Sequence, residues 1–166
     1  MQVPTRRADK LPRQKLDPSL TEDKFNELKD RLVRLKASHP ALSTEVKRLA
    51  EMGDFSENAG YQLAKSRLRG LNQRMLDIED RLKNAVIIET PADNMTVCLG
   101  HHVTIKNDAG REKTYLILGS AETDPTRGVI SHNSPLGAAL IGRRVGDRIK
   151  IPLAGREAEF EVTEIK

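Results

Sequence analysis

Apolar residues repeat with a helical period through residues 21–50 and again through residues 64–82. The apolar positions of the first segment are Phe25, Leu28, Leu32, Leu35, Leu42, Val46 and Leu49. Those of the second segment are Ala64, Leu68, Leu71, Met75, Ile78 and Leu82. Spacings that alternate between three and four are typical of helices that pack as a coiled coil. Because the two helices are expected to flank one short connection, Glu51–Gly53, they must lie antiparallel. The pattern predicts a hairpin about 40–45 Å long, at about 1.5 Å per residue, with an exposed tip.

Two features limit this helical pattern. Pro40 lies inside the first segment, and we expect a kink or break near Ser38–Ala41 because proline lacks an N–H group and its ring clashes with the preceding turn. After residue 84 the period is lost, and an apolar run at 85–88 is followed by Pro91. This run indicates the exit from the second helix, or a strand.

From residue 97 onward, short β-type segments alternate with turn residues. The predicted strands are His102–Lys106, Lys113–Leu118, Gly128–Ser131, Arg148–Ile151 and Glu157–Ile165. Asn107–Gly110 is typical of a hairpin turn. Ser134 followed by Pro135 predicts the start of a short helix that Gly142 ends. The sequence therefore predicts an α+β protein, a helical hairpin followed by a small β-rich domain.

Charge divides the chain in a similar way. The net charge is +4, and residues 1–18 alone contribute +3, whereas residues 19–96 are neutral and residues 97–166 contribute +1. Near-neutral folded parts argue against a protein that wraps nucleic acid. We expect a flexible basic arm at 1–18, a coiled coil at 19–90 and a β-rich domain at 97–166. The arm's basic residues could contact DNA, RNA, a protein partner or nothing.

Cys98 is the only cysteine, so no intrachain disulfide can form, and the spacing of a metal-ligand motif is absent. No apolar run is long enough to cross a membrane, and no secretory signal is present. We expect a cytoplasmic protein without a membrane partner. His101 and His102 are adjacent and would face opposite sides of a strand, so they are poor joint ligands for a metal.

Acidic residues gather at the predicted tip, where Glu51, Asp54 and Glu57 lie within seven positions. Asp54 and Glu57 have the spacing of a capping box, in which an acid caps the helix and a glutamate follows three residues later. The same two carboxylates could instead share a divalent cation, which favours oxygen ligands. In two-metal phosphodiester cleavage such an ion steadies the attacking or the leaving oxygen. A bare rod offers no cleft or base, so it would have to act inside another enzyme.

A basic segment follows the acids. Lys65, Arg67, Arg69 and Arg74 occur with no acidic residue between positions 58 and 76. The simplest interpretation is a solvated face of the coiled coil. The alternative is a track for RNA phosphates, since Lys65 and Arg69 are one helical turn apart and share a face.

The tip segment from Gly53 to Tyr61, GDFSENAGY, resembles the tip signature of the bacterial GreA/GreB transcript cleavage factors, commonly G-D-L-x-E-N-A-x-Y. A second segment, ISHNSPLG at 130–137 with LIG at 140–142 and VGD at 145–147, resembles the hallmark of their C-terminal domain. The resemblance covers residues 19–166 and leaves out the arm.

The resemblance implies an FKBP-like C-terminal domain that docks on RNA polymerase near its secondary channel, and a coiled coil that enters this channel. It implies that Asp54 and Glu57 are catalytic and hold an Mg²⁺ ion jointly with the polymerase, with no ion bound stably by the isolated protein. The chain would then be no enzyme by itself. It would stimulate the polymerase to cut backtracked RNA at its 3′ end and so rescue arrested complexes.

The same resemblance implies the partners and the remaining site residues. The partners are RNA polymerase and the nascent RNA 3′ end, and the protein is expected to be a monomer. Residues expected to contact RNA or polymerase at the hairpin are Phe55, Ser56, Asn58, Tyr61, Lys65 and Arg69. Residues expected to dock on the polymerase are Ser131, Asn133, Ser134, Pro135 and Leu136.

Several positions depart from the family pattern. Phe55 stands in place of the usual leucine, Gly60 where an acid is common, and Ala50 where some members carry a basic residue. Glycine near a helix start weakens it by up to about 1 kcal/mol relative to alanine. Tyr61 is kept, and it could stack on RNA bases or only pack at the tip.

Three rival functions are also compatible with the fold. A regulator that occupies the channel without stimulating cleavage would more simply have lost its tip acids, which are intact here. A prolyl isomerase needs an aromatic-lined site, and the C-terminal part offers only Tyr115 and Phe160. A coiled-coil adaptor would use Asp54 and Glu57 only as caps.

Overall fold

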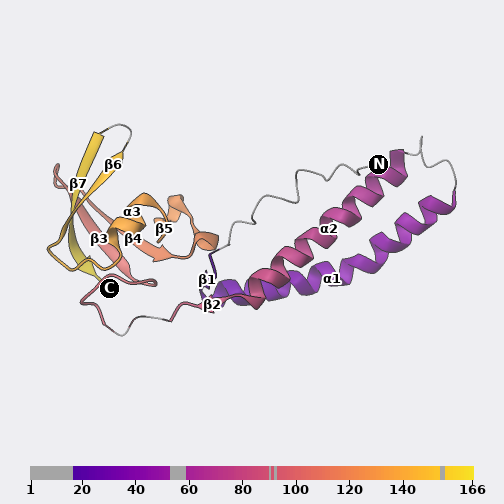
Figure 1. Ribbon diagram of the computed structural model, residues 1–166, viewed down its shortest axis with the longest axis horizontal. Helices are drawn as coiled ribbons and strands as arrows, with labels where there is room; N and C mark the ends of the chain where they lie inside the picture. Colours follow the sequence, from indigo (N-terminus) through magenta and orange to yellow (C-terminus); the bar gives the residue numbers. More distant parts are fainter. Residues whose placement is uncertain (1–16, 53–58, 90, 92, 154–155) are drawn as a thin grey trace, which may run out of the picture.

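The computed structural model describes residues 17–52, 59–89, 91, 93–153 and 156–166. The molecule is elongated, with a helical hairpin at one end and a β-rich domain at the other (Figure 1). The hairpin consists of α1 (Glu22–Glu51) and α2 (Ala59–Lys83). Two short strands, β1 (Ser19–Leu20) and β2 (Val86–Ile87), lie where the hairpin meets the β-rich domain.

Local chemistry sets the start of α1. The Thr21 side chain caps the helix by accepting a hydrogen bond from the Lys24 N–H group at 3.2 Å. Glu22 and Asp23 lie in the first turn, where acidic groups complement the positive end of the helix dipole. The cap and the two acids therefore stabilise the first turn of α1.

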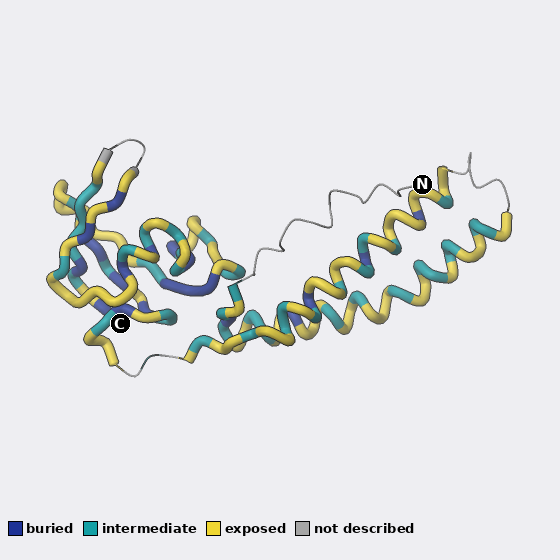
Figure 2. The backbone as a smooth tube through the Cα atoms, viewed as in Figure 1, coloured by how far each residue is buried: buried dark blue, intermediate teal, exposed yellow. Residues whose placement is uncertain are grey.

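A narrow apolar seam holds the two helices together. Its buried residues are Leu28 of α1 and Ala64, Leu71 and Ile78 of α2. Most other residues of the described hairpin are exposed or half-buried (Figure 2). An ion pair between Lys36 and Glu79, 2.7 Å from Nζ to Oε1, also joins the helices but is exposed. The predicted heptad hairpin is confirmed, and its stability comes from the seam rather than from surface charge.

Of the kink or break expected near Pro40, the break was wrong, because α1 continues through this residue to Glu51, and the kink stays a prediction. Proline leaves the carbonyl one turn before it without a backbone donor, at a cost of about 3 kcal/mol. Hydroxyl groups on both sides bond to the backbone: Ser38 Oγ donates to Leu35 O at 2.8 Å and Thr44 Oγ1 to Pro40 O at 3.0 Å. Packing along the seam outweighs the local cost, as tertiary contacts commonly override helix propensity.

The base of the hairpin has its own small core. Strands β1 and β2 pair in parallel, with Ser19 opposite Val86 and Leu20 opposite Ile87. The apolar run at 85–88 thus contains a strand, one of the two alternatives that the sequence left open. Leu20 is fully buried and forms a core cluster with Leu28 and Ile78, against which residues from both helices and from the β-rich domain pack: Leu32, Leu35, Leu82, Ala85 and Ala121.

The β-rich domain is a five-stranded mixed sheet in the order β5-β4-β3-β7-β6. Its strands are β3 (His102–Asn107), β4 (Glu112–Leu118), β5 (Val129–Ser131), β6 (Arg148–Leu153) and β7 (Arg156–Ile165). Only the β4–β5 pair is parallel. All five predicted strands are present, each with one end shifted by one or two residues.

Short helical elements complete the domain: η2 (Ser120–Glu122), η3 (Pro125–Arg127) and α3 (Pro135–Leu140). Ser134 caps α3 and Gly142 follows it in the left-handed region, as predicted. The core residues lie between the sheet and α3, and they are Val97, Val103, Ile105, Ile117, Leu140, Ile149, Ile151, Val162 and Ile165. The arrangement confirms the predicted α+β class.

Candidate functional site

The predicted tip residues Asp54, Phe55, Ser56, Glu57 and Asn58 lie outside the described residues. Their roles as cap, metal ligand or contact therefore stay predictions. The structure describes the ends of the helices on either side of them, which lie at the end of the molecule farthest from the β-rich domain (Figure 1).

The α1 end of this region is exposed. Met52 caps α1 through its backbone N–H group, which donates to Ala50 O, and 67% of Met52 is accessible to solvent. The Arg48 Nη1 atom lies 3.7 Å from the Met52 sulfur. Glu51, the third acid of the tip cluster, is also exposed. The described end of α1 is therefore open to solvent.

The basic segment lies along the solvent-exposed part of α2. Lys65, Arg67, Arg69 and Arg74 are all exposed. The Lys65 ammonium lies 5.4 Å from the centre of the Tyr61 ring, which is half-buried. This cation–π contact, worth about 0.5–1 kcal/mol at an exposed site, ties the two predicted contact residues together. Tyr61 thus lies beside a cation.

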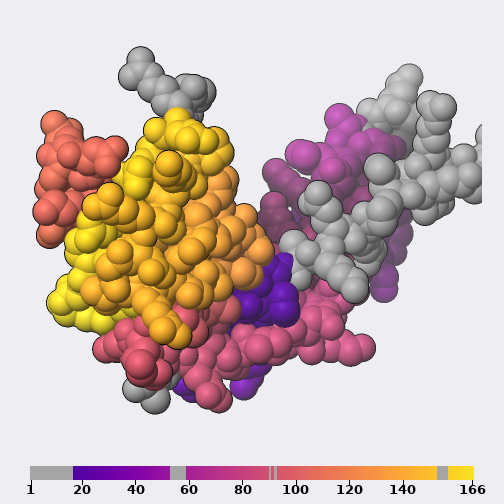
Figure 3. All heavy atoms as spheres, turned by 60° about the vertical axis from the view of Figure 1, so that its left-hand side comes forward, coloured from indigo at the N-terminus to yellow at the C-terminus, as the bar shows by residue number. Residues whose placement is uncertain are grey.

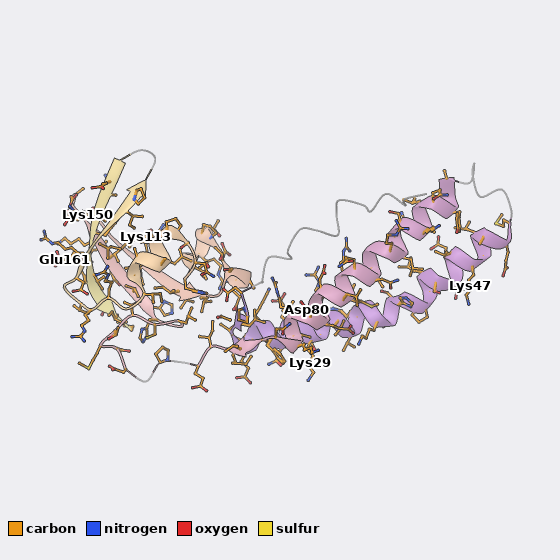
Figure 4. All side chains as sticks on the ribbon, viewed as in Figure 1. Lys29, Lys47, Asp80, Lys113, Lys150 and Glu161 are labelled. Carbon is orange, nitrogen blue, oxygen red and sulfur yellow. The ribbon has the colours of Figure 1, made fainter. Side chains whose placement is uncertain are left out.

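Charged side chains cover the hairpin along its whole length, from Lys29 and Asp80 near the base to Lys47 near the tip (Figure 4). Within α2 the charges are segregated, because the acids Asp77, Glu79 and Asp80 all follow Arg74. The part of α2 that adjoins the tip therefore has basic but no acidic residues, whereas Arg81 and Lys83 at the other end lie among the acids.

The predicted docking residues Ser131, Asn133 and Ser134 are bonded within the protein. Ser131 is 7% exposed, and its Oγ lies 2.9 Å from Ser120 Oγ and accepts from the Asn133 N–H group at 3.0 Å. Ser134 Oγ donates to Ser131 O at 2.6 Å and accepts from the Gly137 N–H group at 3.1 Å. These bonds build the turn from β5 into α3.

The other two predicted docking residues differ in their surroundings. Pro135 is exposed at the start of α3, whereas Leu136 is half-buried against the core of the domain. The docking role of all five residues stays a prediction. The hydrogen bonds of Ser131, Asn133 and Ser134 show that these three residues also stabilise the turn from β5 into α3.

Sequence reasoning missed one polar site, which joins the hairpin base to the β-rich domain. The Asp17 side chain is 7% exposed, and its Oδ2 accepts from the Ser120 N–H group at 2.7 Å. Asn133 Nδ2 and His132 Nδ1 each lie 3.5 Å from the same oxygen. Burial raises the pKa of Asp17, but hydrogen bonds from Ser120 and Ser19 outweigh it and leave the pKa below its usual value of 3.8.

A second carboxylate acts at the same joint. Glu122 accepts hydrogen bonds from the Thr21 N–H group at 2.9 Å and from the Thr21 hydroxyl. Partners in these pairs are more than 100 residues apart in the sequence. No periodic or motif signal links positions so distant, and this is why the sequence did not reveal the joint.

His101 and His102 are adjacent in the sequence and differ in burial. His101 is buried and its Nδ1 accepts from the Cys98 N–H group at 3.0 Å, whereas His102 is exposed. The two rings therefore lie in different environments. In the part of the chain that the structure describes, no three His, Cys, Asp or Glu residues are grouped as metal ligands. None of the described helices is long and apolar enough to cross a membrane.

Comparisons with known proteins cover both parts of the chain. Residues 19–87 match the family model described as transcription elongation factor, N-terminal. Residues 92–166 match the model described as transcription elongation factor, GreA/GreB, C-term. The matched ranges correspond to the helical hairpin with its base and to the β-rich domain.

Curated relatives match over nearly the whole chain. A protein named transcription elongation factor GreA from Macrococcus caseolyticus is 38% identical over 149 residues, covering 88% of this chain and 94% of its own. A protein of the same name from Thermotoga neapolitana is 37% identical over 148 residues, covering 88% and 95%. Among solved structures, GreA factor homolog 1 of Thermus thermophilus aligns at 27% identity with a TM-score of 0.42, covering 90% of this chain and 99% of its own.

Proposed function

The chain belongs to the GreA/GreB family of transcription elongation factors, and we propose that it inserts its hairpin into the secondary channel of RNA polymerase and stimulates cleavage of backtracked RNA. The polymerase supplies the catalytic centre, and this protein is an accessory factor. The observation that carries the proposal is the shape of the hairpin, a long exposed rod, together with the acidic segment that the sequence places between its two helices.

The dimensions of the rod suit this role. Helix α1 has 30 residues, so it extends about 45 Å at about 1.5 Å per residue. Its seam is narrow and most other residues are exposed or half-buried, so its outer surface can face the walls of a channel. A rod of this length can bring its tip to a catalytic centre while the β-rich domain stays outside the enzyme.

Asp54 and Glu57 supply carboxylate oxygens, the ligands that Mg²⁺ prefers in proteins, and two carboxylates are a typical protein share of such a site. A bound Mg²⁺ ion stabilises the attacking or the leaving oxygen in phosphodiester hydrolysis. The two carboxylates provide negative charge at the tip, and the helical hairpin brings this charge into the polymerase. The β-rich domain fixes where the rod enters.

The exposed basic residues of α2 are suited to the displaced RNA. Lys65 and Arg69 share a face, and Tyr61 lies beside Lys65. Cations attract phosphates, and an aromatic ring offers a stacking surface that accepts any base. We assign to this face the contact with the RNA 3′ segment just behind the tip.

The test uses RNA polymerase stalled in a backtracked complex that carries RNA labelled near its 3′ end. Wild-type protein should release short 3′ fragments, whereas Asp54→Asn and Glu57→Gln should bind the complex and release few. Both variants keep polar groups of the same size and lose the charge. Glu51→Gln is the matched control, since Glu51 is an exposed acid of the same cluster outside the signature segment.

Two results would contradict the proposal. If wild-type protein releases no fragments, the chain binds the polymerase only as a regulator. If Asp54→Asn and Glu57→Gln cleave as well as Glu51→Gln, the two acids serve only as helix caps.

A further inference from the structure

Five residues form a polar clasp between the hairpin base and the β-rich domain: Asp17, Thr21, Ser120, Glu122 and Asn133. Asp17 and Thr21 precede α1, whereas the other three belong to η2 and to the turn after β5. Figure 3 shows this N-terminal segment, in indigo, lying against the orange surface of the β-rich domain. The clasp is therefore a contact between two parts that are far apart in sequence.

The Asp17 half of the clasp is almost closed to solvent. With a side chain only 7% exposed, Asp17 accepts from the Ser19 N–H group through Oδ1 at 3.1 Å and from the Ser120 N–H group through Oδ2 at 2.7 Å. Asn133 donates both to this carboxylate and to Ser120 Oγ, at 3.5 and 3.3 Å. Bonds to a charged acceptor are about twice as strong as neutral ones. Both oxygens of Asp17 are thus engaged, one on each side of the joint.

The Glu122 half acts on the rod itself. Thr21 is the cap of α1, and its N–H group and hydroxyl both donate to Glu122. The residue that fixes the first turn of the rod is therefore bound to the β-rich domain through two hydrogen bonds. A rotation of α1 about its base would have to break them.

The backbones of Ser19 and Gly119 also lie close together at the joint. A Cβ atom placed on Gly119 would lie 2.0 Å from Ser19 O, so only glycine allows β1 to approach η2 this closely. Leu20, the next residue of β1, is fully buried and packs with Ala121 of η2. Polar bonds and apolar packing therefore act at the same place.

The length of the hairpin magnifies any movement at this joint. A tilt of about 10° at the base of a rod about 45 Å long displaces its end by about 8 Å. Catalytic groups misplaced by about 1 Å can lose about two orders of magnitude in rate. A hairpin that carries reactive groups at its tip consequently needs a stiff base.

We infer that the clasp sets the direction of the hairpin relative to the β-rich domain, and that Asp17 and Glu122 are positioning residues for the tip. The structural part of this inference stands by itself, whereas its consequence for RNA cleavage rests on the proposed function. The motif residue Asn133 gains a role here besides the docking predicted for it: its side chain holds the N-terminal segment.

The direct test measures the distance between the two ends of the full-length molecule. Spin labels are placed at Met52→Cys, beside the tip, and at Ala109→Cys, in the exposed turn between β3 and β4, with Cys98→Ser as background. Wild-type protein should give one narrow distance distribution. Asp17→Asn should broaden or shift it, because whichever way the amide turns, one of the two N–H groups at 2.7 and 3.1 Å faces an NH₂ group.

Glu122→Ala should broaden the distribution in the same way, since it leaves the Thr21 N–H group without its acceptor. Glu27→Gln is the matched control: Glu27 is an acid near the start of α1 whose ion pair, with Lys24, stays within the helix. Circular dichroism must show unchanged helix content in all variants. If Glu122→Ala loses helix content, the distance distribution of Asp17→Asn alone tests the inference. An unchanged distribution in Asp17→Asn would overturn the inference.

A cleavage assay on backtracked complexes separates this inference from the proposed function. Asp17→Asn should lower the maximal cleavage rate by about tenfold while the concentration for half-maximal effect changes less than twofold, because misdirection affects the tip and not docking. Asp54→Asn should lose cleavage with an unaltered distance distribution. If wild-type protein does not stimulate cleavage, the proposed function is refuted, but the distance result still stands. If Asp17→Asn has a broadened distance distribution and still cleaves at the full maximal rate, the positioning role is refuted.

Discussion

Replacing Gly119 with alanine should force open the joint between the hairpin and the β-rich domain. Gly119 has φ −68° and ψ 161°, an ordinary conformation for alanine, so the substitution adds no backbone strain. The new Cβ atom would lie 2.0 Å from Ser19 O and 2.9 Å from Ser19 C. Real Cβ atoms essentially never approach other atoms closer than 3.0 Å, so β1 must move away by about 1 Å.

The structure sets the size of the effect. A displacement of about 1 Å across a helix about 10 Å wide tilts the rod by about 6°, which moves the far end of a rod about 45 Å long by about 4–5 Å. The same displacement draws Leu20 out of a site where it is fully buried. Exposing a leucine completely costs about 1.5–3 kcal/mol, so Gly119→Ala should lower the free energy of unfolding by about 1–3 kcal/mol.

Chemical denaturation followed by circular dichroism measures the stability, and spin labels at positions 52 and 109 measure the displacement. Gly70→Ala is the matched control, because Gly70 lies within α2 and an added Cβ meets nothing within 4 Å. This control should raise the stability by up to about 1 kcal/mol. A Gly119→Ala variant as stable as wild type, with an unchanged distance, would refute the account of the joint.

Three further predictions follow from the described contacts. Ile78→Ala should cost about 2–5 kcal/mol in denaturant unfolding because Ile78 is buried in the seam, whereas Val33→Ala, at a position 62% exposed, should stay within about 0.5 kcal/mol; equal costs would contradict the seam. The stability difference between wild type and Asp17→Asn should be largest above pH 3.8 and shrink as the pH falls below that value, because the hydrogen bonds that lower the pKa of Asp17 stabilise the fold only while its carboxylate is charged; a difference that does not shrink with falling pH would count against this linkage. Replacing Lys65 and Arg69 together with glutamine should weaken cleavage several-fold and flatten its salt dependence, whereas Lys47→Gln on α1 should change neither; an unaltered salt dependence in the double variant would remove these two residues from the RNA contact.

Local patterns in the sequence predicted most of the fold. The heptad seam specified both helices and their antiparallel packing, and turn residues placed all five strands of the sheet. Pro40 misled the prediction of a break because a local penalty was weighed without the packing of α1 against α2. Helix propensities describe the free-energy cost of a residue within its own helix, but they do not include the stabilisation from packing against another segment of the chain.

Contacts between distant segments were not predictable from one sequence. Asp17 appeared as the end of a flexible arm, yet its carboxylate bonds to Ser120, 103 positions away. Asn133 was assigned to docking because its motif resembles a family hallmark, and a motif does not show whether a side chain points outward or toward another part of its own chain. The candidate tip residues came from the family resemblance and their spacing, and they lie outside the described residues.

The central claim is that the tip carboxylates hold a shared Mg²⁺ ion within the polymerase, and the Mg²⁺ dependence of cleavage tests it most directly. Single-turnover cleavage of a backtracked complex is measured over a range of Mg²⁺ concentrations with saturating wild-type protein, Asp54→Asn or Glu51→Gln. The account predicts that Asp54→Asn requires at least about tenfold more Mg²⁺ for half-maximal cleavage, since a lost ligand weakens the site by 1.4 kcal/mol or more, about a factor of ten. Glu51→Gln should match wild type. An unchanged Mg²⁺ requirement in Asp54→Asn would contradict the claim.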